Sequence, residues 1–289
     1  MSNPDLSAEL LDHIVDLLHD DEEALKACCL VSKSWIPGAR KHLFANVKLH
    51  PLARLQAWKN TFPNPSTSPA CYTKTLVIGG LEEVTAADAQ EGGWIPTFSR
   101  VEDLGASVHN PMICLAPFHG FSTAIKSVHI DFSCSPCSIF NLIYSFPLLE
   151  DLSLALFFSL YHPADFNEQP AIPQPHSSPP FTGLLNLSVH VPEGMKSITR
   201  WLLLLPSGLR FRDVRLRLGC DEDVSPISAL VEACSSTLET LEIDCLIYRT
   251  FVSHPCRHRW LTTVCRRVSR LDRSLEGDET QERKVCVQI

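Results

Sequence analysis

Cysteine and histidine are the residues whose chemistry could be most specific in this chain, and each occurs twelve times. Cys134 and Cys137 form its one C-x-x-C pair, and neither a second pair nor H-x-x-x-H follows at zinc-finger spacing. Most cysteines sit inside apolar patterns, where a reduced thiol behaves as a small hydrophobic side chain. We therefore expect core thiols and no metal site, with zinc at this pair as the minor alternative.

The sequence contains none of the common catalytic signatures. G-x-S-x-G, G-x-x-x-x-G-K-[ST], H-E-x-x-H and G-x-G-x-x-G are all absent. Composition leaves Cys–His catalysis open, but no pattern supports it. Asn186-Leu-Ser188 is a formal glycosylation site that we expect to be unused, because it lies on a predicted strand. We expect a protein that is not an enzyme, with no catalytic residue and no cofactor.

An L-x-x-L-x-L pattern recurs along the chain. The structural elements that it forms hold the polar residues between its leucines in place. Leu149-Glu-Asp-Leu152-Ser-Leu154 fits it, and related patterns start at residues 73, 101, 125, 184, 211 and 238, which are 24 to 35 residues apart. Leucine-rich repeats have a period of about 20–29 residues. Helix-like segments lie between them at 138–146, 195–205 and 226–235. Because one strand–helix unit cannot bury its own apolar face, we expect stacked units with a parallel sheet.

The variable positions of these strands predict an outward face. Side chains alternate along a strand, so the residues between the leucines point away from the core. These residues are Ser127, His129, Asp131, Asp151, Ser153, Asn186, Ser188, His190, Asp213, Arg215, Arg217, Thr240, Glu242 and Asp244. As a solvated face they need no ligand, whereas as a substrate face they could recognise a charged peptide.

One long interval in the repeats is explained by residues 162–181, which contain six prolines. Such a segment forms neither helix nor ladder, so we expect an exposed insertion. A flexible surface loop is the simpler interpretation, and a peptide-like docking segment is the alternative.

The N-terminal residues 5–44 predict three short helices. Leu6, Leu10, Ile14, Leu17 and Leu18 recur at helical spacing and share one face of the first helix. The inward residues of the second helix are Leu25, Cys28 and Cys29. Those of the third helix are Val31, Trp35 and Leu43. Ser7 is an imperfect start signal, while Asp20 and Asp21 suit a turn and the next N-cap. About forty residues bury little core alone, so this unit needs a neighbour or a partner.

The remaining segments predict a connector and a divergent C-terminus. We expect a strand at 46–50, a helix at 52–61 and a domain boundary in the Pro-rich stretch 62–70. Residues 249–289 carry a net charge of +4 within a chain of −8. We read 248–289 as a basic and polar tail, a capping helix or an aberrant gene end.

Composition restricts the class of protein. Apolar residues make up 45 % and charged residues 20 %, which fits a globular chain. No apolar run is long enough to cross a bilayer, and the N-terminus has no signal-peptide pattern. We therefore expect a cytoplasmic or nuclear protein without a membrane partner. The acidic body argues against nucleic-acid binding.

Together these features resemble the fungal F-box proteins with degenerate leucine-rich repeats, of the kind found in mushroom-type fungi. The F-box pattern is matched by Leu6-Ser-Ala-Glu9-Leu10, by Ile14 and Leu17, and by Leu30-Val31-Ser32-Lys33-Ser34-Trp35. The chain departs from it at Ser7, where the family usually has proline. The stretches TFPNPSTSPACYTKTLVIGG and VTAADAQEGGWIPTFSRV also resemble the region after the F-box, and the similarity extends to about Cys245.

The resemblance implies an α/β fold in which a three-helix F-box precedes an irregular leucine-rich-repeat solenoid with a parallel concave sheet. The implied domains are residues 5–45 for the F-box, 46–70 for the connector, 71–247 for the solenoid and 248–289 for the tail. The implied function is substrate recognition in a cullin–RING ubiquitin ligase, whose Skp-type adaptor bridges the F-box to a cullin.

The implied adaptor contacts, or their supports, are Leu6, Ser7, Leu10, Ile14, Leu30, Val31 and Trp35. Ile14 and Trp35 could equally belong to the core of the helical unit. The repeats would bind an unknown protein substrate. A ligase-independent interaction scaffold is the alternative.

Overall fold

The computed structural model of this chain describes residues 7–50, 52–79, 84, 86–89, 93–108, 121–133, 136–156, 179–189, 192–206, 208–219, 224–246 and 284–288. They fall into two compact units. Unit 1 lies within residues 1–105 and 120–125, and unit 2 within residues 106–119 and 126–289. The fold is α/β with parallel strand pairing. In the described part of the chain, no helix is long and apolar enough to cross a membrane.

Unit 1 begins with three short helices, α1 (Ala8–Leu17), α2 (Glu22–Val31) and α3 (Ile36–Leu43). Both predicted helix starts are confirmed. The Ser7 hydroxyl accepts from Leu10 N at 3.4 Å, and Asp21 Oδ1 accepts from Ala24 N at 2.9 Å. These bonds satisfy donors that lack a partner within the helix. The prediction that Val31 belongs to the third helix is wrong, because Val31 ends α2.

The three helices share a small apolar core. Its buried residues are Val15, Leu25, Cys28 and Ala39, with Leu18, Cys29, Trp35 and Leu43 packed against them. Helix α3 lies close to α1 at Gly38, where a Cβ would lie 3.3 Å from Asp12 Oδ1 and 3.4 Å from Val15 Cγ1. So few buried side chains give the helices little stability of their own.

The rest of unit 1 contains β1 (Asn46–Leu49) and α4 (Leu52–Thr61), at the predicted strand and helix. The strand β2 (Thr75–Ile78) pairs with β1 in parallel. The Pro-rich stretch between α4 and β2 forms the 3-10 turns η1 (Pro65–Thr67) and η2 (Pro69–Tyr72). The unit also contains α5 (Ala86–Ala89) and η4 (Ile95–Thr97), and the division between the units falls within β3 (Asp103–Val108).

Aromatic side chains pack around Trp58 of α4. The Trp58 ring centroid lies 5.9 Å from that of Phe44, 4.8 Å from that of Phe62 and 5.9 Å from that of Phe98. The Pro-rich stretch therefore belongs to the packed part of unit 1, with Pro69 and Ala70 buried in it.

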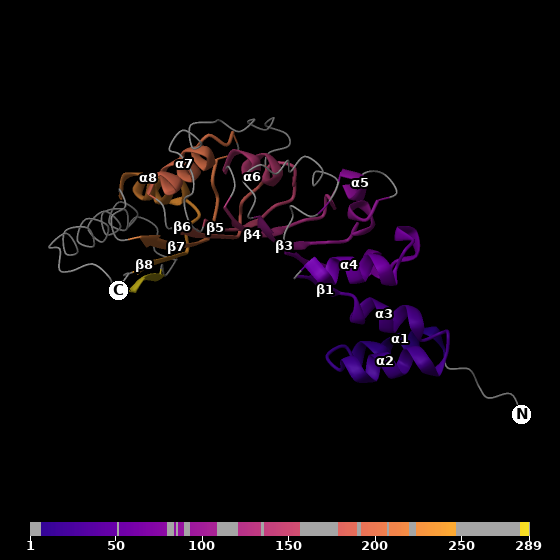
Figure 1. Cartoon of the computed structure of the whole chain (residues 1–289). Coiled ribbons are helices and arrows are strands. Elements are labelled where there is room, and N and C mark those ends of the chain that lie inside the picture. Colours follow the sequence, from indigo (N-terminus) through magenta and orange to yellow (C-terminus); the bar gives the residue numbers. More distant parts are fainter. Residues whose placement is uncertain are drawn as a thin grey trace, which may run out of the picture. The chain divides into compact units, whose positions relative to one another are not determined.

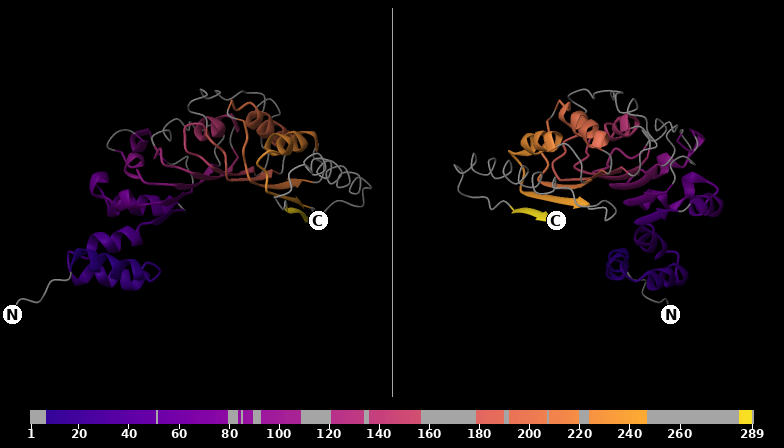
Figure 2. Two further views of the ribbon diagram at one scale, coloured as in Figure 1. Left: turned by 180° about the vertical axis from the view of Figure 1, so that it is seen from behind. Right: turned by 60° about the vertical axis from the view of Figure 1, so that its left-hand side comes forward.

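Unit 2 alternates strands with helices. Its strands are β4 (Ser127–Phe132), β5 (Asp151–Leu156), β6 (Leu184–Val189), β7 (Asp213–Gly219), β8 (Thr240–Leu246) and β9 (Lys284–Gln288). Each pairs in parallel with the next along the chain. Helices α6 (Pro136–Ile143), α7 (Pro192–Leu203) and α8 (Val224–Cys234) cover one face of the strands (Figure 1). Figure 2 shows the same one-sided cover from two other directions.

The core of unit 2 lies between this sheet and its helices. Leu152, Leu154, Leu185 and Leu187 are fully buried, and burial alternates along β6 as the repeat pattern predicts. Large aromatic side chains fill the helical layer: the Phe140 and Trp201 rings meet edge to face, with centroids 5.1 Å apart. Dense packing of this kind supplies most of the stability of such a layer.

The strand register corrects one predicted repeat. The pattern at 184 aligns Leu187 with Leu152, whereas the structure pairs Leu152 with Leu185. The repeat is therefore two residues out of step with the prediction. Because side chains alternate with a period of two, this shift leaves the predicted inward and outward faces unchanged.

The C-terminal tail contains one described element. Residues 284–288 form β9, whose backbone pairs with Thr240–Asp244 of β8. This strand was not predicted from the sequence. The rest of the tail, and most of the predicted insertion at 162–181, lie outside the described residues. The predicted domain boundaries stay predictions.

Candidate interaction surfaces

Two of the three N-terminal helices of unit 1 expose large apolar side chains. Leu10 and Leu17 of α1 are 45 % and 70 % exposed, and Leu30 and Val31 at the end of α2 are 88 % and 71 % exposed. We call these four residues the helical apolar surface. Leu10 and Leu17 are seven residues apart and so lie on one face of α1, while Val15 faces the core.

The predicted adaptor contacts fall into two groups. Leu10, Leu30 and Val31 belong to the helical apolar surface, whereas Ile14 is half-buried and Trp35 is half-buried against the core. Ser7 is exposed at the start of α1, and Leu6 lies outside the described residues. Leu17 also belongs to the helical apolar surface, although it was not among the predicted adaptor contacts.

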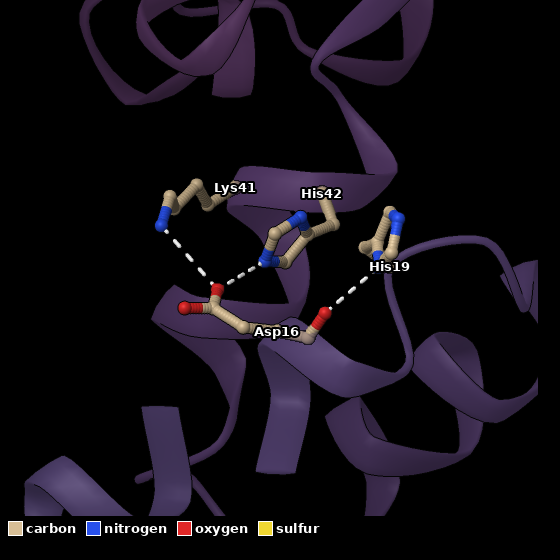
Figure 3. A network of polar contacts seen from close by, with 4 residues as sticks. All are labelled: Asp16, His19, Lys41 and His42. Carbon is tan, nitrogen blue, oxygen red and sulfur yellow. Dashed lines mark hydrogen bonds and ion pairs between the residues drawn. The ribbon is translucent and has the colours of Figure 1, made fainter. Parts of the chain in front are cut away.

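Beside this surface, Asp16 joins α1 to α3 (Figure 3). Asp16 Oδ1 accepts from His42 Nε2 at 2.7 Å and lies 3.5 Å from Lys41 Nζ. Because a carboxylate only accepts, His42 Nε2 must carry the hydrogen. The hydrogen bond from His42, assisted by Lys41, holds the pKa of Asp16 below its ordinary value of 3.8. These contacts fix how α3 lies on α1.

A row of polar side chains crosses the sheet face of unit 2 that is opposite the described helices α6, α7 and α8. His129, Ser153 and Asn186 occupy neighbouring positions of β4, β5 and β6. Asn186 Nδ2 donates to Ser153 Oγ at 3.0 Å, which leaves the hydroxyl hydrogen for His129 Nδ1, 2.7 Å away. In the neutral ring the other hydrogen is then on Nε2, 3.3 Å from Asp131 Oδ1. All four side chains are thus ordered by one directional chain of hydrogen bonds.

This order of hydroxyl, imidazole and carboxylate is also that of an activated serine nucleophile. Such a serine becomes reactive where water is excluded and donors stabilise an oxyanion. Here the side chains of His129 and Asp131 are 54 % and 39 % exposed. Water therefore competes for the imidazole and the carboxylate, which weakens their effect on the Ser153 hydroxyl.

Two ion pairs continue the same face. Arg215 Nε lies 3.4 Å from Glu242 Oε2, and Arg217 Nε lies 3.4 Å from Asp244 Oδ2. Both pairs join residues that are directly opposite each other on β7 and β8. The structure therefore brings together seven of the eight predicted substrate-face residues: His129, Asp131, Asp151, Arg215, Arg217, Glu242 and Asp244. The eighth, His190, lies outside the described residues.

Unit 1 also holds a largely buried ion pair. Lys59 Nζ lies 2.7 Å from Asp88 Oδ2, and the two side chains are 20 % and 10 % exposed. They line a small pocket together with Leu55, Trp58 and Ile95, among other apolar residues. The pairing of its two charged groups makes this a structural contact between α4 and α5.

The described cysteines are mostly packing residues. Cys28, Cys137 and Cys234 are buried, and burial raises the pKa of the Cys234 thiol to about 11. At neutral pH this thiol is protonated and unreactive. Cys134, the other half of the C-x-x-C pair, lies outside the described residues. Among those that are described, no group of three or more His, Cys, Asp or Glu side chains could hold a metal ion.

Comparison with known proteins provides no relative: no family model, no curated protein and no solved structure matches this chain.

Proposed function

We propose that this chain is the substrate-recognition subunit of a cullin–RING (SCF-type) ubiquitin ligase. Helices α1–α3 would be an F-box that docks on a Skp-type adaptor, which in turn binds a cullin. Strands β4–β8 with their helices would belong to an irregular leucine-rich-repeat solenoid that binds a protein substrate. No chemistry on the substrate is required of the chain itself.

The helical apolar surface is the observation that carries the proposal. Leu30 and Val31 are 88 % and 71 % exposed although they end a helix that buries Leu25 and Cys28. Covering one such side chain is worth roughly 1.5–3 kcal/mol. Four of them represent several kcal/mol available to a partner, against the cost of association. Their positions coincide with the F-box pattern in the sequence.

The repeat geometry supports the second half of the proposal. Strands β4 to β8 begin at residues 127, 151, 184, 213 and 240, so the intervals are 24, 33, 29 and 27 residues. Only the interval with the Pro-rich insertion exceeds the usual leucine-rich-repeat period. Each strand buries one face and presents mostly polar side chains on the other, as an interaction sheet requires.

Co-purification of the full chain with a fungal Skp-type adaptor tests the proposal. Leu30→Lys removes the most exposed of the described leucines, and a lysine near the C-terminus of α2 is compatible with the helix dipole. Leu148→Lys is the matched control, since Leu148 is 50 % exposed but belongs to unit 2. We expect stoichiometric binding for the wild type and for the control, and at least tenfold weaker binding for Leu30→Lys.

Other results would overturn the proposal. A folded wild-type chain that does not bind the adaptor would favour a ligase-independent interaction scaffold, which uses the same polar sheet face. Equal binding by Leu30→Lys and the wild type would show that the helical apolar surface serves another purpose.

A further inference from the structure

The strand starts of unit 2 place two acidic side chains on either side of an apolar one. Leu184 of β6 is directly opposite Asp213 of β7, and its backbone N–H donates to Asp151 Oδ1 of β5 at 2.6 Å. All three side chains are half-buried on the face opposite the described helices. We call these residues the acidic row.

The spacing of the acidic row suits one extended side chain. Asp151 and Asp213 are two strands apart, which corresponds to about 9.5 Å between their backbones. Leu184 lies between them as an apolar floor. Lysine and arginine combine an aliphatic stem with a charged end, so they can lie on an apolar side chain and reach a carboxylate.

The carboxylate of Asp151 is held in place before any partner arrives. Its Oδ1 occupies the space beside Gly183, where a Cβ would overlap it. Among the described residues no partner contacts Oδ2, and none contacts the Asp213 carboxylate. Arg212 and Arg215, one residue before and two residues after Asp213 in the sequence, pair with Glu239 and Glu242 instead.

The charge of the whole face favours the same kind of partner. The described outward positions of β4–β8 carry five carboxylates (Asp131, Asp151, Asp213, Glu242 and Asp244) and two guanidinium groups (Arg215 and Arg217), a net charge of −3. Such a face attracts cations and repels phosphate groups, so it disfavours nucleic acid.

We infer that the sheet face of unit 2 binds an extended, lysine- or arginine-containing segment of a protein, with one basic side chain on Leu184 between Asp151 and Asp213. The inference rests on the proposed function, because it specifies the substrate class of the same face. In this arrangement the acidic row binds the basic side chain of the segment. The polar row from His129 to Asn186 binds backbone groups of the same segment next to that side chain.

Selection from a phage-displayed random dodecapeptide library on the immobilised full chain tests this inference. We expect the selected peptides to contain more Lys and Arg than Asp and Glu. The variant Asp151→Asn with Asp213→Asn removes both charges, while the amide oxygen that replaces the Asp151 carboxylate can still accept the hydrogen bond from Leu184. The matched control, Asp20→Asn with Glu232→Gln, removes two exposed charges elsewhere.

The synthetic form of the most enriched peptide should bind the double Asp→Asn variant about fivefold to tenfold more weakly at about 0.1 M salt, as expected for two exposed charge pairs. The control should bind within twofold of wild type. No enrichment, enrichment of acidic or neutral peptides, or unchanged binding by the double Asp→Asn variant would overturn the inference. Preferential binding of an oligonucleotide would do so too.

The adaptor experiment separates this result from the proposed function. The double Asp→Asn variant should still co-purify with the Skp-type adaptor. Enrichment of basic peptides by a chain that does not bind the adaptor would leave the inference standing and overturn the ligase proposal.

Discussion

Replacing Leu10 by glutamate should separate docking from folding in the N-terminal helices. Leu10 is the third residue of α1, and its N–H already donates to the Ser7 hydroxyl at 3.4 Å. A glutamate at this position completes a capping box, because its carboxylate can accept from the Ser7 N–H. The same carboxylate also enters the helical apolar surface.

The expected change in the free energy of unfolding is small. Leu10 is 45 % exposed, so slightly more than half of its surface is buried within the chain. Losing that burial costs about 1–1.5 kcal/mol. The new capping bond and the negative charge at the start of the helix together stabilise the folded chain by about 0.5–2 kcal/mol. The free energy of unfolding should therefore change by less than about 1 kcal/mol.

The expected change in docking is large. An adaptor would lose the apolar contact of Leu10 and would bury an unpaired carboxylate, which together cost at least about 2–3 kcal/mol. This corresponds to about a 30- to 150-fold loss of affinity. Thermal unfolding and adaptor binding by calorimetry measure the two effects on the same sample.

Two results would refute the reasoning. Adaptor binding as tight as that of the wild type would show that Leu10 is outside the docking surface. A strongly destabilised variant would show that α1 does not begin with the cap formed by Ser7. Leu148→Glu provides the matched control for docking: it loses a similar amount of burial in unit 2 but should leave adaptor binding unchanged.

Three further predictions follow from contacts within the chain. Ser7 has a φ of −61°, which proline can adopt. In Ser7→Pro the lost capping bond and the reduced entropy of the unfolded chain should offset each other, so the free energy of unfolding should change by less than about 1 kcal/mol. A double-mutant cycle on Arg215 and Glu242 by urea unfolding should give a coupling of about 0.2–1 kcal/mol that disappears at about 1 M salt. The pKa of Asp16 is lowered by His42, so its stabilising contribution is present above the unfolded value of 3.8 and is lost as the pH falls through the folded value. Asp16→Asn should therefore destabilise the chain at neutral pH and match the wild type in acid.

Each of these has a contrary result that chemical or thermal unfolding can show. A loss of several kcal/mol in Ser7→Pro would mean that the proline ring clashes at the start of α1. A coupling that persists at high salt would mean that the Arg215–Glu242 pair is more buried than its exposed side chains indicate. If Asp16→Asn and the wild type still differ in free energy of unfolding at acid pH, the effect of the substitution comes from packing and not from charge.

Local patterns in the sequence predicted the elements of the fold well. The alternation of leucines identified β4 to β8, because a strand with one buried face needs a period of two. The short polar residues Ser7 and Asp21 identified two helix starts, because a cap acts within three residues of sequence. These signals are local, so no knowledge of the fold was needed to find them.

The misplaced features are those that depend on long-range contacts. The register of β6 was predicted two residues out of step because two apolar patterns overlap at Leu184–Leu187, and only pairing with β5 selects one. The strand β9 was missed because its five residues contain no repeat signal, and its pairing partner β8 precedes it by some forty residues.

The sequence by itself determined which side chains are apolar, which alternate along strands and which begin helices. Only the tertiary structure decided that Leu10, Leu17, Leu30 and Val31 stay exposed while Val15 and Leu25 fill the small core. It also decided that His129, Ser153 and Asn186 meet in one row, and that Asp151 and Asp213 lie on either side of Leu184. The physical reason is that hydrophobicity is a property of a residue, whereas exposure and adjacency depend on which other segments pack beside it.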